Sequence, residues 1–160
     1  MTHYPEILSG LITGKHKWLV TGAGGFIGSH LTEALLSLGQ EVTGLDNFSR
    51  GHIENISAAL ALSGHAELFT LIEGSITDSD TCRESVKGCD YVLHHAALAS
   101  VPESLADPVG YHAVNVTGFM NVLQAAREAG VMRVVYASSS AVYGDDETMP
   151  KVEGITGKSL

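Results

Sequence analysis

The chain has 160 residues, which suits one domain with a sizeable core rather than two independent domains. Its formal charge is −9, and no run of Lys or Arg provides the positive surface that a nucleic-acid backbone requires. Residues 1–17 lack the features of a secretory signal, and no stretch of about 18 apolar residues occurs. The two cysteines are a poor basis for a disulfide framework. We therefore expect a soluble, cytoplasmic protein that binds neither nucleic acid nor membrane.

Strand and helix patterns alternate along the first half of the sequence. Residues 1–16 are expected to be a terminal extension, and the apolar run 17–21 predicts a strand that meets a glycine cluster. From Phe26 to Leu38 the apolar residues repeat at helical spacing, and Gly39 ends this helix. The patterns that follow predict a strand at 41–45, a helix at 52–63, a strand at 68–72 and a helix at 78–87.

The second half continues the alternation. A strand is predicted at 91–95, a long helix at about 108–128 and a strand at 131–138 that ends in three serines, whereas 144–160 shows no element of its own. This order predicts an α/β fold for residues 17–160, a Rossmann-like doubly wound parallel sheet with helices on both faces.

A glycine-rich turn joins the first strand to the first helix. Gly22 permits the tight turn, Gly25 lets the backbone approach a pyrophosphate, and Gly28 lets helix and strand pack closely. The helix amides then favour an anion. Asp46 ends the second strand 18 residues after Gly28, where a carboxylate can accept both hydroxyls of an adenosine ribose and would repel a 2′-phosphate. We therefore expect NAD, with NADP left open because Arg50 lies close by.

Five motifs occur in an order that resembles the extended short-chain dehydrogenase/reductase superfamily, in its NAD-dependent nucleotide-sugar epimerase and dehydratase family. They are Thr21–Gly28, Leu45–Phe48, His94–Leu98, Asn115–Gly118 and Ser138–Gly144, and the resemblance runs from about Lys17 to the end of the chain. The terminal extension, the residues after Asp46, and segments 97–102 and 150–153 most resemble the 4-epimerases of UDP-N-acetylhexosamines.

The resemblance implies a role for each matched position. Pyrophosphate contacts are expected from Gly22, Gly25, Phe26, Ile27 and Gly28, and adenosine-ribose contacts from Asp46 and Asn47. The other cofactor positions are Ile76 at the adenine, Ala96, Ala97 and Leu98 beneath the nicotinamide-side ribose, Asn115 bracing that loop, and Ser138 near the nicotinamide. Ser139 matches the catalytic serine or threonine that bonds the sugar hydroxyl. One departure is Ser75, where the family usually has an aspartate for the adenine amino group.

The resemblance also leaves a gap. The family's general base is a tyrosine in Tyr-x-x-x-Lys, and none of the five tyrosines has a lysine four residues later. In the family that motif follows a segment resembling 157–160, so we expect the catalytic pair and the substrate-binding lobe to be missing, the Rossmann fold to be incomplete, and the chain to be inactive alone. The UDP-sugar would be the substrate of the full-length family.

Several alternatives stay open. A non-catalytic NAD-binding module or pseudoenzyme would use the fold without the base, and a dehydratase or decarboxylase of the same superfamily would differ mainly in the missing half. Dehydration is disfavoured because Ser139-Ser140-Ala141 replaces the Thr-Asp-Glu of the 4,6-dehydratases. No metal site is expected, since His94 and His95 point to opposite faces of a strand, and the serines lack the Gly-x-Ser-x-Gly elbow of a hydrolase. The resemblance also implies a homodimer, with the helix at 108–128 as one candidate surface.

Overall fold

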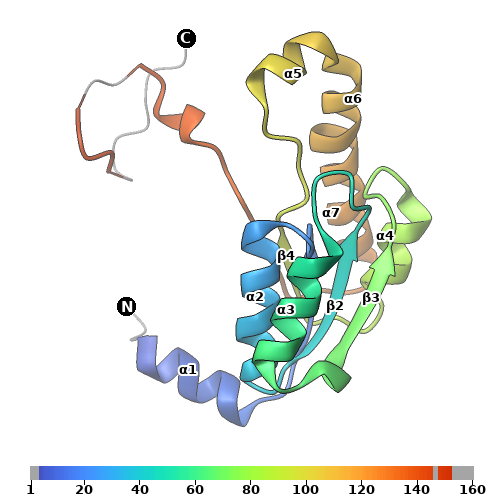
Figure 1. Cartoon of the computed structure of the whole chain (residues 1–160), viewed down its shortest axis with the longest axis vertical. Coiled ribbons are helices and arrows are strands. Elements are labelled where there is room, and N and C mark those ends of the chain that lie inside the picture. The colour runs from blue at the N-terminus through green and yellow to red at the C-terminus, as the bar shows by residue number, and fades with distance from the viewer. Residues whose placement is uncertain (1–3, 146–147, 153–160) are drawn as a thin grey trace.

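A single parallel sheet organises the molecule (Figure 1). The computed structural model describes residues 4–145 and 148–152. The strands β1 (Lys17–Thr21), β2 (Glu41–Asp46), β3 (Phe69–Glu73), β4 (Tyr91–His94) and β5 (Arg133–Tyr136) lie in the order β3-β2-β1-β4-β5. All neighbours pair in parallel. The predicted Rossmann-like architecture is confirmed, with every strand end within about two residues of its prediction.

The central strand marks the point where the order of the sheet reverses. β1 pairs with β2 on one side and with β4 on the other, so Thr21 lies level with both Leu45 and His94. The carboxyl ends of all five strands share one edge of the sheet. In open α/β sheets such a reversal leaves a crevice at that edge, because the connections leave β1 and β4 toward opposite faces.

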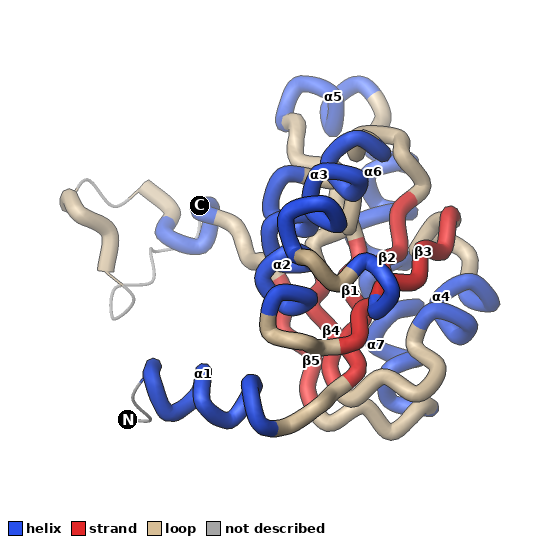
Figure 2. The backbone as a smooth tube through the Cα atoms, turned by 60° about the horizontal axis from the view of Figure 1, so that its bottom comes forward, coloured by secondary structure: helices blue, strands red, loops and turns tan. Residues whose placement is uncertain are grey.

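Helices cover both faces of the sheet (Figure 2). On one face α2 (Phe26–Ser37) and α3 (Ile53–Ser63) pack in a core that includes Val20 and Leu36. On the other, α4 (Ser79–Ser85) and α7 (Phe119–Glu128) pack in a core that includes Leu19 and Val92. Leu19 and Val20 serve opposite cores because successive strand side chains point to opposite faces.

The predicted long helix is continuous but changes its winding. It comprises α6 (Pro108–His112), a π-helical segment at Ala113–Gly118, and α7. Gly118 is the close-packing point, since a Cβ there would lie 2.7 Å from the Ile76 side chain. The π segment, a geometry often found at functional sites, carries Asn115 toward the edge of the sheet.

Two helices were not predicted. α1 (Tyr4–Thr13) projects from the body in Figure 1, and the buried Gln40 amide fastens its end by donating to Leu11 O (2.7 Å) and Gly14 O (2.9 Å). The Gln40 oxygen accepts from His16 N (3.1 Å) and from Trp18 Nε1 (3.2 Å).

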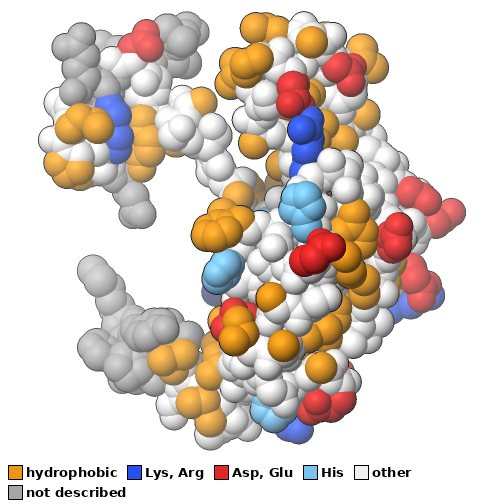
Figure 3. All heavy atoms as spheres, viewed as in Figure 1, with side chains coloured by type: hydrophobic (Ala, Val, Ile, Leu, Met, Phe, Trp, Pro, Cys, Tyr) orange, Lys and Arg blue, Asp and Glu red, His pale blue; other side chains and the backbone are white. Residues whose placement is uncertain are grey.

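The second unpredicted helix is α5 (Val101–Ala106), which is too short to show a hydrophobic period. The Ser100 hydroxyl caps it by accepting from Glu103 N, and hydrophobic side chains gather on the lobe that it forms in Figure 3. Short 3₁₀ turns are also present at Ala66–Leu68 and Ser140–Tyr143. Within the described part of the chain, no helix has both the length and the apolar character needed to cross a membrane.

Candidate functional site

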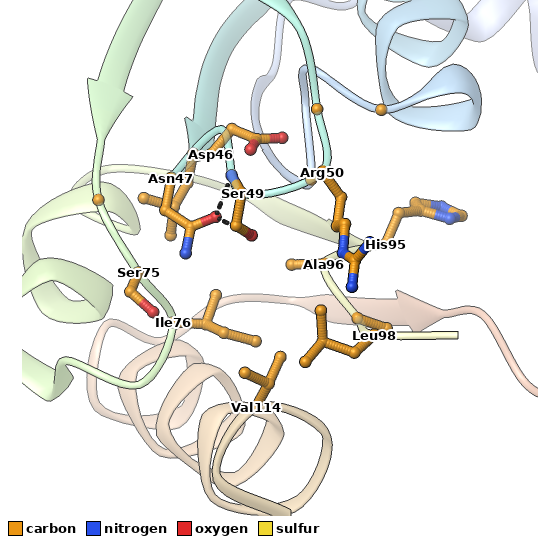
Figure 4. A pocket seen from close by; sticks show the side chains of 16 residues that line it. Asp46, Asn47, Ser49, Arg50, Ser75, Ile76, His95, Ala96, Leu98 and Val114 are labelled. Carbon is orange, nitrogen blue, oxygen red and sulfur yellow. Dashed lines mark hydrogen bonds between the residues drawn. The ribbon is translucent and has the colours of Figure 1, made fainter. Parts of the chain in front are cut away.

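Two adjoining cavities open at the carboxyl edge of the sheet, where its order reverses. The first, of about 630 Å³ with its open mouth, lies between the ends of β1, β2 and β3 and the loop after β4 (Figure 4). The second lies over the ends of β4 and β5. Residues 95–98 line both, so the cavities form one elongated cleft across the switch point.

Most residues predicted for the site lie in this cleft. The first cavity contains Gly22, Gly25, Asp46, Asn47 and Ile76; Ala96, Ala97 and Leu98 line both; the second adds Asn115, Ser138 and Ser139. Three predicted residues, Phe26, Ile27 and Gly28, line neither cavity. Phe26 and Ile27 are exposed, and the Phe26 ring packs on His30. The side chains of these two residues therefore point away from the cleft, and only their backbone could serve it.

The glycine-rich turn is closed by contacts that leave no space for side chains. A Cβ on Gly28 would lie 2.1 Å from Gly22 O, and one on Gly22 would lie 2.8 Å from Ala96 N. Gly22 also has φ +71°, which side chains disfavour. Gly25 is the N-cap of α2 and no side chain caps it, so the first amides of this helix remain available at the edge of the cleft.

The Asp46 carboxylate ties the end of β2 to the glycine-rich turn. One oxygen accepts from Gly24 N (2.8 Å) and the other from Phe48 N (2.8 Å), and the residue is 8% exposed. A carboxylate offers about four acceptor positions, and these two contacts use two of them. Figure 4 shows Asn47 beside Asp46, and the Asn47 side-chain oxygen accepts from Ser49 N and Oγ.

Thr21 and His94 form a buried polar junction beneath the loop that the two cavities share. The Thr21 hydroxyl accepts from His95 N and Ala96 N, each at 3.2 Å, and lies 2.7 Å from His94 Nδ1. We infer that the Thr21 hydroxyl donates its hydrogen bond to His94 Nδ1, because the lone pairs of that hydroxyl accept from the two amides. Burial lowers the pKa of His94 to about 4, and the neighbouring His95 adds a smaller effect in the same direction, so His94 is neutral at pH 7.

Asn115 holds the same loop from the other side. Its oxygen accepts from Leu98 N (2.9 Å) and its nitrogen donates to Leu98 O (2.8 Å). Further along the second cavity, Ser138 and Ser139 are exposed, and the Ser139 hydroxyl accepts from Ala141 N (3.1 Å). Ser75, where the sequence departs from the family, has its hydroxyl turned to the Thr77 hydroxyl at 2.8 Å.

Sequence reasoning did not assign several residues of the cleft. Ser49 and Arg50 line the first cavity, as does Val114, which faces Ile76 and Leu98 in Figure 4. Tyr111 lines the second cavity, and its hydroxyl accepts from Ser100 N (3.1 Å) and donates to Glu103 (3.3 Å). The sequence indicated Arg50 only as a reason to leave NADP open, through its position two residues after the Asp46 motif. For Tyr111 there was no signal, because its partner helix α5 was not predicted.

Comparison with known proteins identifies the family to which this cleft belongs. Residues 18–159 match the model of the NAD dependent epimerase/dehydratase family. A UDP-glucose 4-epimerase of Erwinia amylovora is 39% identical over 137 residues, which cover 84% of this chain and 40% of that protein.

Solved structures agree in fold. The UDP-glucose-4-epimerase from Stenotrophomonas maltophila, with bound NAD and formylated UDP-arabinopyranose, has a TM-score of 0.82 at 31% identity over 91% of this chain and 43% of its own. The UDP-N-acetylglucosamine 4-epimerase from Methanobrevibacter ruminantium M1, in complex with UDP-N-acetylmuramic acid, has a TM-score of 0.78 at 37% identity over 91% of this chain and 44% of its own. The chain spans less than half the length of each of these relatives, and it belongs to the NAD-dependent epimerase/dehydratase family.

Proposed function

We propose that this chain is the NAD-binding portion of a nucleotide-sugar 4-epimerase acting on a UDP-hexose or UDP-N-acetylhexosamine. The observation that carries the proposal is the cleft at the switch point, where the uncapped start of α2 and the Asp46 carboxylate meet. Helix amides suit a pyrophosphate, and a carboxylate at the end of the second strand suits a ribose diol. The family match and the NAD-bound relative support the same cofactor.

The residues present fit a dinucleotide. Glycine at positions 22 and 25 keeps the first cavity free of side chains next to the helix amides. Ile76 and Val114 provide an apolar wall suited to an adenine ring, and the second cavity continues the cleft for the remaining half of the dinucleotide.

Each group of residues then has a defined task. The turn residues Gly22, Gly25, Phe26, Ile27 and Gly28 would hold the pyrophosphate, with the first amides of α2 as donors because the amides of residues 22–25 already donate within the chain. The Asp46 carboxylate would accept hydrogen bonds from the adenosine ribose, beside Asn47. Asn115 and Thr21 fix the loop 96–98 under the second ribose, while Ser138 and Ser139 lie where the nicotinamide and the sugar would meet. NAD, when bound, accepts and returns a hydride at the sugar carbon.

The cofactor preference is tested by Asp46→Ala. We expect the affinity for NAD to fall more than that for NADP, because the lost carboxylate binds the 2′-hydroxyl and repels a 2′-phosphate. Isothermal titration with both cofactors gives the ratio. The ratio is the readout, since loss of the bonds to Gly24 N and Phe48 N weakens both cofactors together. An equal loss for both would remove Asp46 as the determinant.

The 160-residue chain should bind NAD weakly without turning over a UDP-sugar, because it contains no Tyr-x-x-x-Lys. Loss of a positioned acid or base typically reduces the rate by about 10²–10⁴-fold. The residues expected to precede that motif, 157–160, lie outside the described part of the chain. A coupled epimerase assay on the 160-residue chain that gives ordinary turnover would contradict this proposal.

A homodimer through residues 108–128 is a further part of the proposal. Exposed apolar side chains at Val109, Val116 and Met120 lie on this segment and support it. Sedimentation velocity of the wild type against Met120→Glu is the test, and a monomeric wild type would contradict it.

A further inference from the structure

Arg50 is the single Lys or Arg among the described residues that line the two cavities. The protein as a whole carries a formal charge of −9. Binding a dinucleotide brings a pyrophosphate anion into this acidic molecule, so one cation at the cleft has a large share in offsetting the repulsion.

The loop that carries Arg50 is anchored to the glycine-rich turn. His52 N donates to Gly24 O (2.9 Å), and the Asn55 side chain donates to the same oxygen (2.8 Å). Gly51 packs so closely that a Cβ there would lie 2.8 Å from the Gly24 carbonyl carbon. The backbone next to Arg50 is therefore fixed against the turn whose helix amides suit an anion.

From this anchored backbone the Arg50 side chain reaches across the cleft. Figure 4 shows it extending toward Ala96 and Leu98, and its guanidinium forms an ion pair with Glu103 of α5. Basic and acidic side chains meet between the α5 lobe and the body in Figure 3. Tyr111 holds the Glu103 carboxylate through its hydroxyl.

The ion pair is a weak one that an anion can replace. The Arg50 and Glu103 side chains are 59% and 46% exposed, and exposed pairs of this kind contribute little to stability. A guanidinium binds phosphate oxygens through two parallel N–H donors, which is a stronger interaction than an exposed single contact.

We propose that Arg50 binds the pyrophosphate of the dinucleotide and that Glu103 competes for the same guanidinium. This inference rests on the proposed function, because it assigns a residue to the NAD site. Glu103 thus sets the affinity of the cleft from a helix on the opposite side, without contacting the cofactor.

The test compares ligands with and without a pyrophosphate. Titration calorimetry with NAD, ADP-ribose and adenosine is carried out on the wild-type chain, Arg50→Met and Glu103→Gln. Arg50→Met should weaken NAD and ADP-ribose by about tenfold and leave adenosine unchanged, since adenosine has no phosphate. Glu103→Gln should tighten NAD and ADP-ribose by about threefold, because it removes the competing carboxylate.

Two variants serve as controls. Arg50→Lys keeps the charge but loses the planar fork, so it should fall between wild type and Arg50→Met. Arg83→Met removes another exposed arginine that pairs with carboxylates, Asp80 and Glu128, outside the cleft, and should leave every affinity unchanged.

The outcomes separate this inference from the proposed function. If wild type binds none of the three ligands, the proposed NAD site itself is wrong, and the inference falls with it. If wild type binds NAD and Arg50→Met binds it equally well, the inference alone is overturned. It is also overturned if Arg50→Met weakens the binding of adenosine as much as that of NAD, because this would indicate a defect in the loop. A third contrary outcome is weaker binding of NADP with unchanged binding of NAD, which would place Arg50 at the 2′-phosphate.

Discussion

The two ends of the cleft are built in different ways. The glycine-turn region, residues 17–51, is built on buried strands, because the last three residues of β1 and the last five of β2 are buried. The serine region, residues 133–145, lies at the edge of the sheet, where Val135 and Tyr136 are 50% and 55% exposed and the three serines are exposed. Close packing within the chain therefore fixes the proposed cofactor end, whereas the proposed substrate end lacks cover among the described residues.

The strongest challenge to this comparison is Gly28→Ala. The added Cβ would lie 2.1 Å from Gly22 O and 2.8 Å from Gly22 C, and these backbone atoms cannot rotate away as a side chain could. We expect the free energy of unfolding to fall by about 3 kcal/mol and NAD binding to be lost. Chemical denaturation measures the first effect. Gly10→Ala, where nothing lies within 4 Å of the new Cβ, is the matched control and should not destabilise the chain.

His94 lies at the junction of the two regions and makes stability depend on pH. Its pKa is about 4 in the folded protein and 6.5 ordinarily, so the unfolded chain binds the proton first as pH falls. Its contribution is therefore complete above pH 6.5 and is lost as pH falls from about 6.5 to about 4, and the free energy of unfolding at pH 5 should be about 2 kcal/mol below that at pH 7. Urea unfolding at both pH values measures this. His94→Gln should show a smaller difference, and an identical pH dependence in that variant would exclude His94 as the cause.

A pair of valine substitutions compares the regions directly. Val92 on β4 is fully buried, whereas Val135 on the neighbouring β5 is half exposed. Val92→Ala should cost about 2 kcal/mol and Val135→Ala under about 0.5 kcal/mol, because only the first removes methyl groups from a packed core. The difference in the denaturation midpoints gives the result. Equal costs would mean that Val135 is covered in solution.

The smallest effect is expected at Ser139. Ser139→Ala removes an exposed hydroxyl whose partner is Ala141 N, so stability should change by less than about 0.5 kcal/mol. The affinity for NAD should also remain within about twofold of that of the wild type. Calorimetry and thermal melting check both, and a large loss of NAD binding would assign Ser139 to the cofactor rather than to the sugar.

Most of the fold could be predicted because its signals are local. The apolar run before Gly22, the helical spacing after Phe26 and the recurrence of both patterns predict the strands and the two-sided covering. The short helix α5 could not be predicted, because six residues are too few for a period and its cap at Ser100 is not distinctive.

The site was predictable where one motif contains all its parts. The turn at Gly22–Gly28 and Asp46 each belong to a motif that the sequence displays locally. Asn115, in a different motif from Leu98, could be assigned to the loop only through the resemblance. Contacts between distant segments gave no signal. The Arg50–Glu103 pair joins residues 53 positions apart, and the Thr21 hydroxyl meets a histidine 73 positions later, which only the folded arrangement reveals.

The Gln40 side chain has a consequence for where the cooperative unit of the protein begins. It is 1% exposed, and its amide serves the backbone at Leu11, Gly14 and His16. Detaching this segment would remove three of the hydrogen-bond partners of a buried carboxamide, so the linker into β1 should open only in the same event that opens the sheet. The His16 amide would then exchange its hydrogen as slowly as the strands do, and the boundary of the folding unit would lie near Leu11 rather than at the first strand.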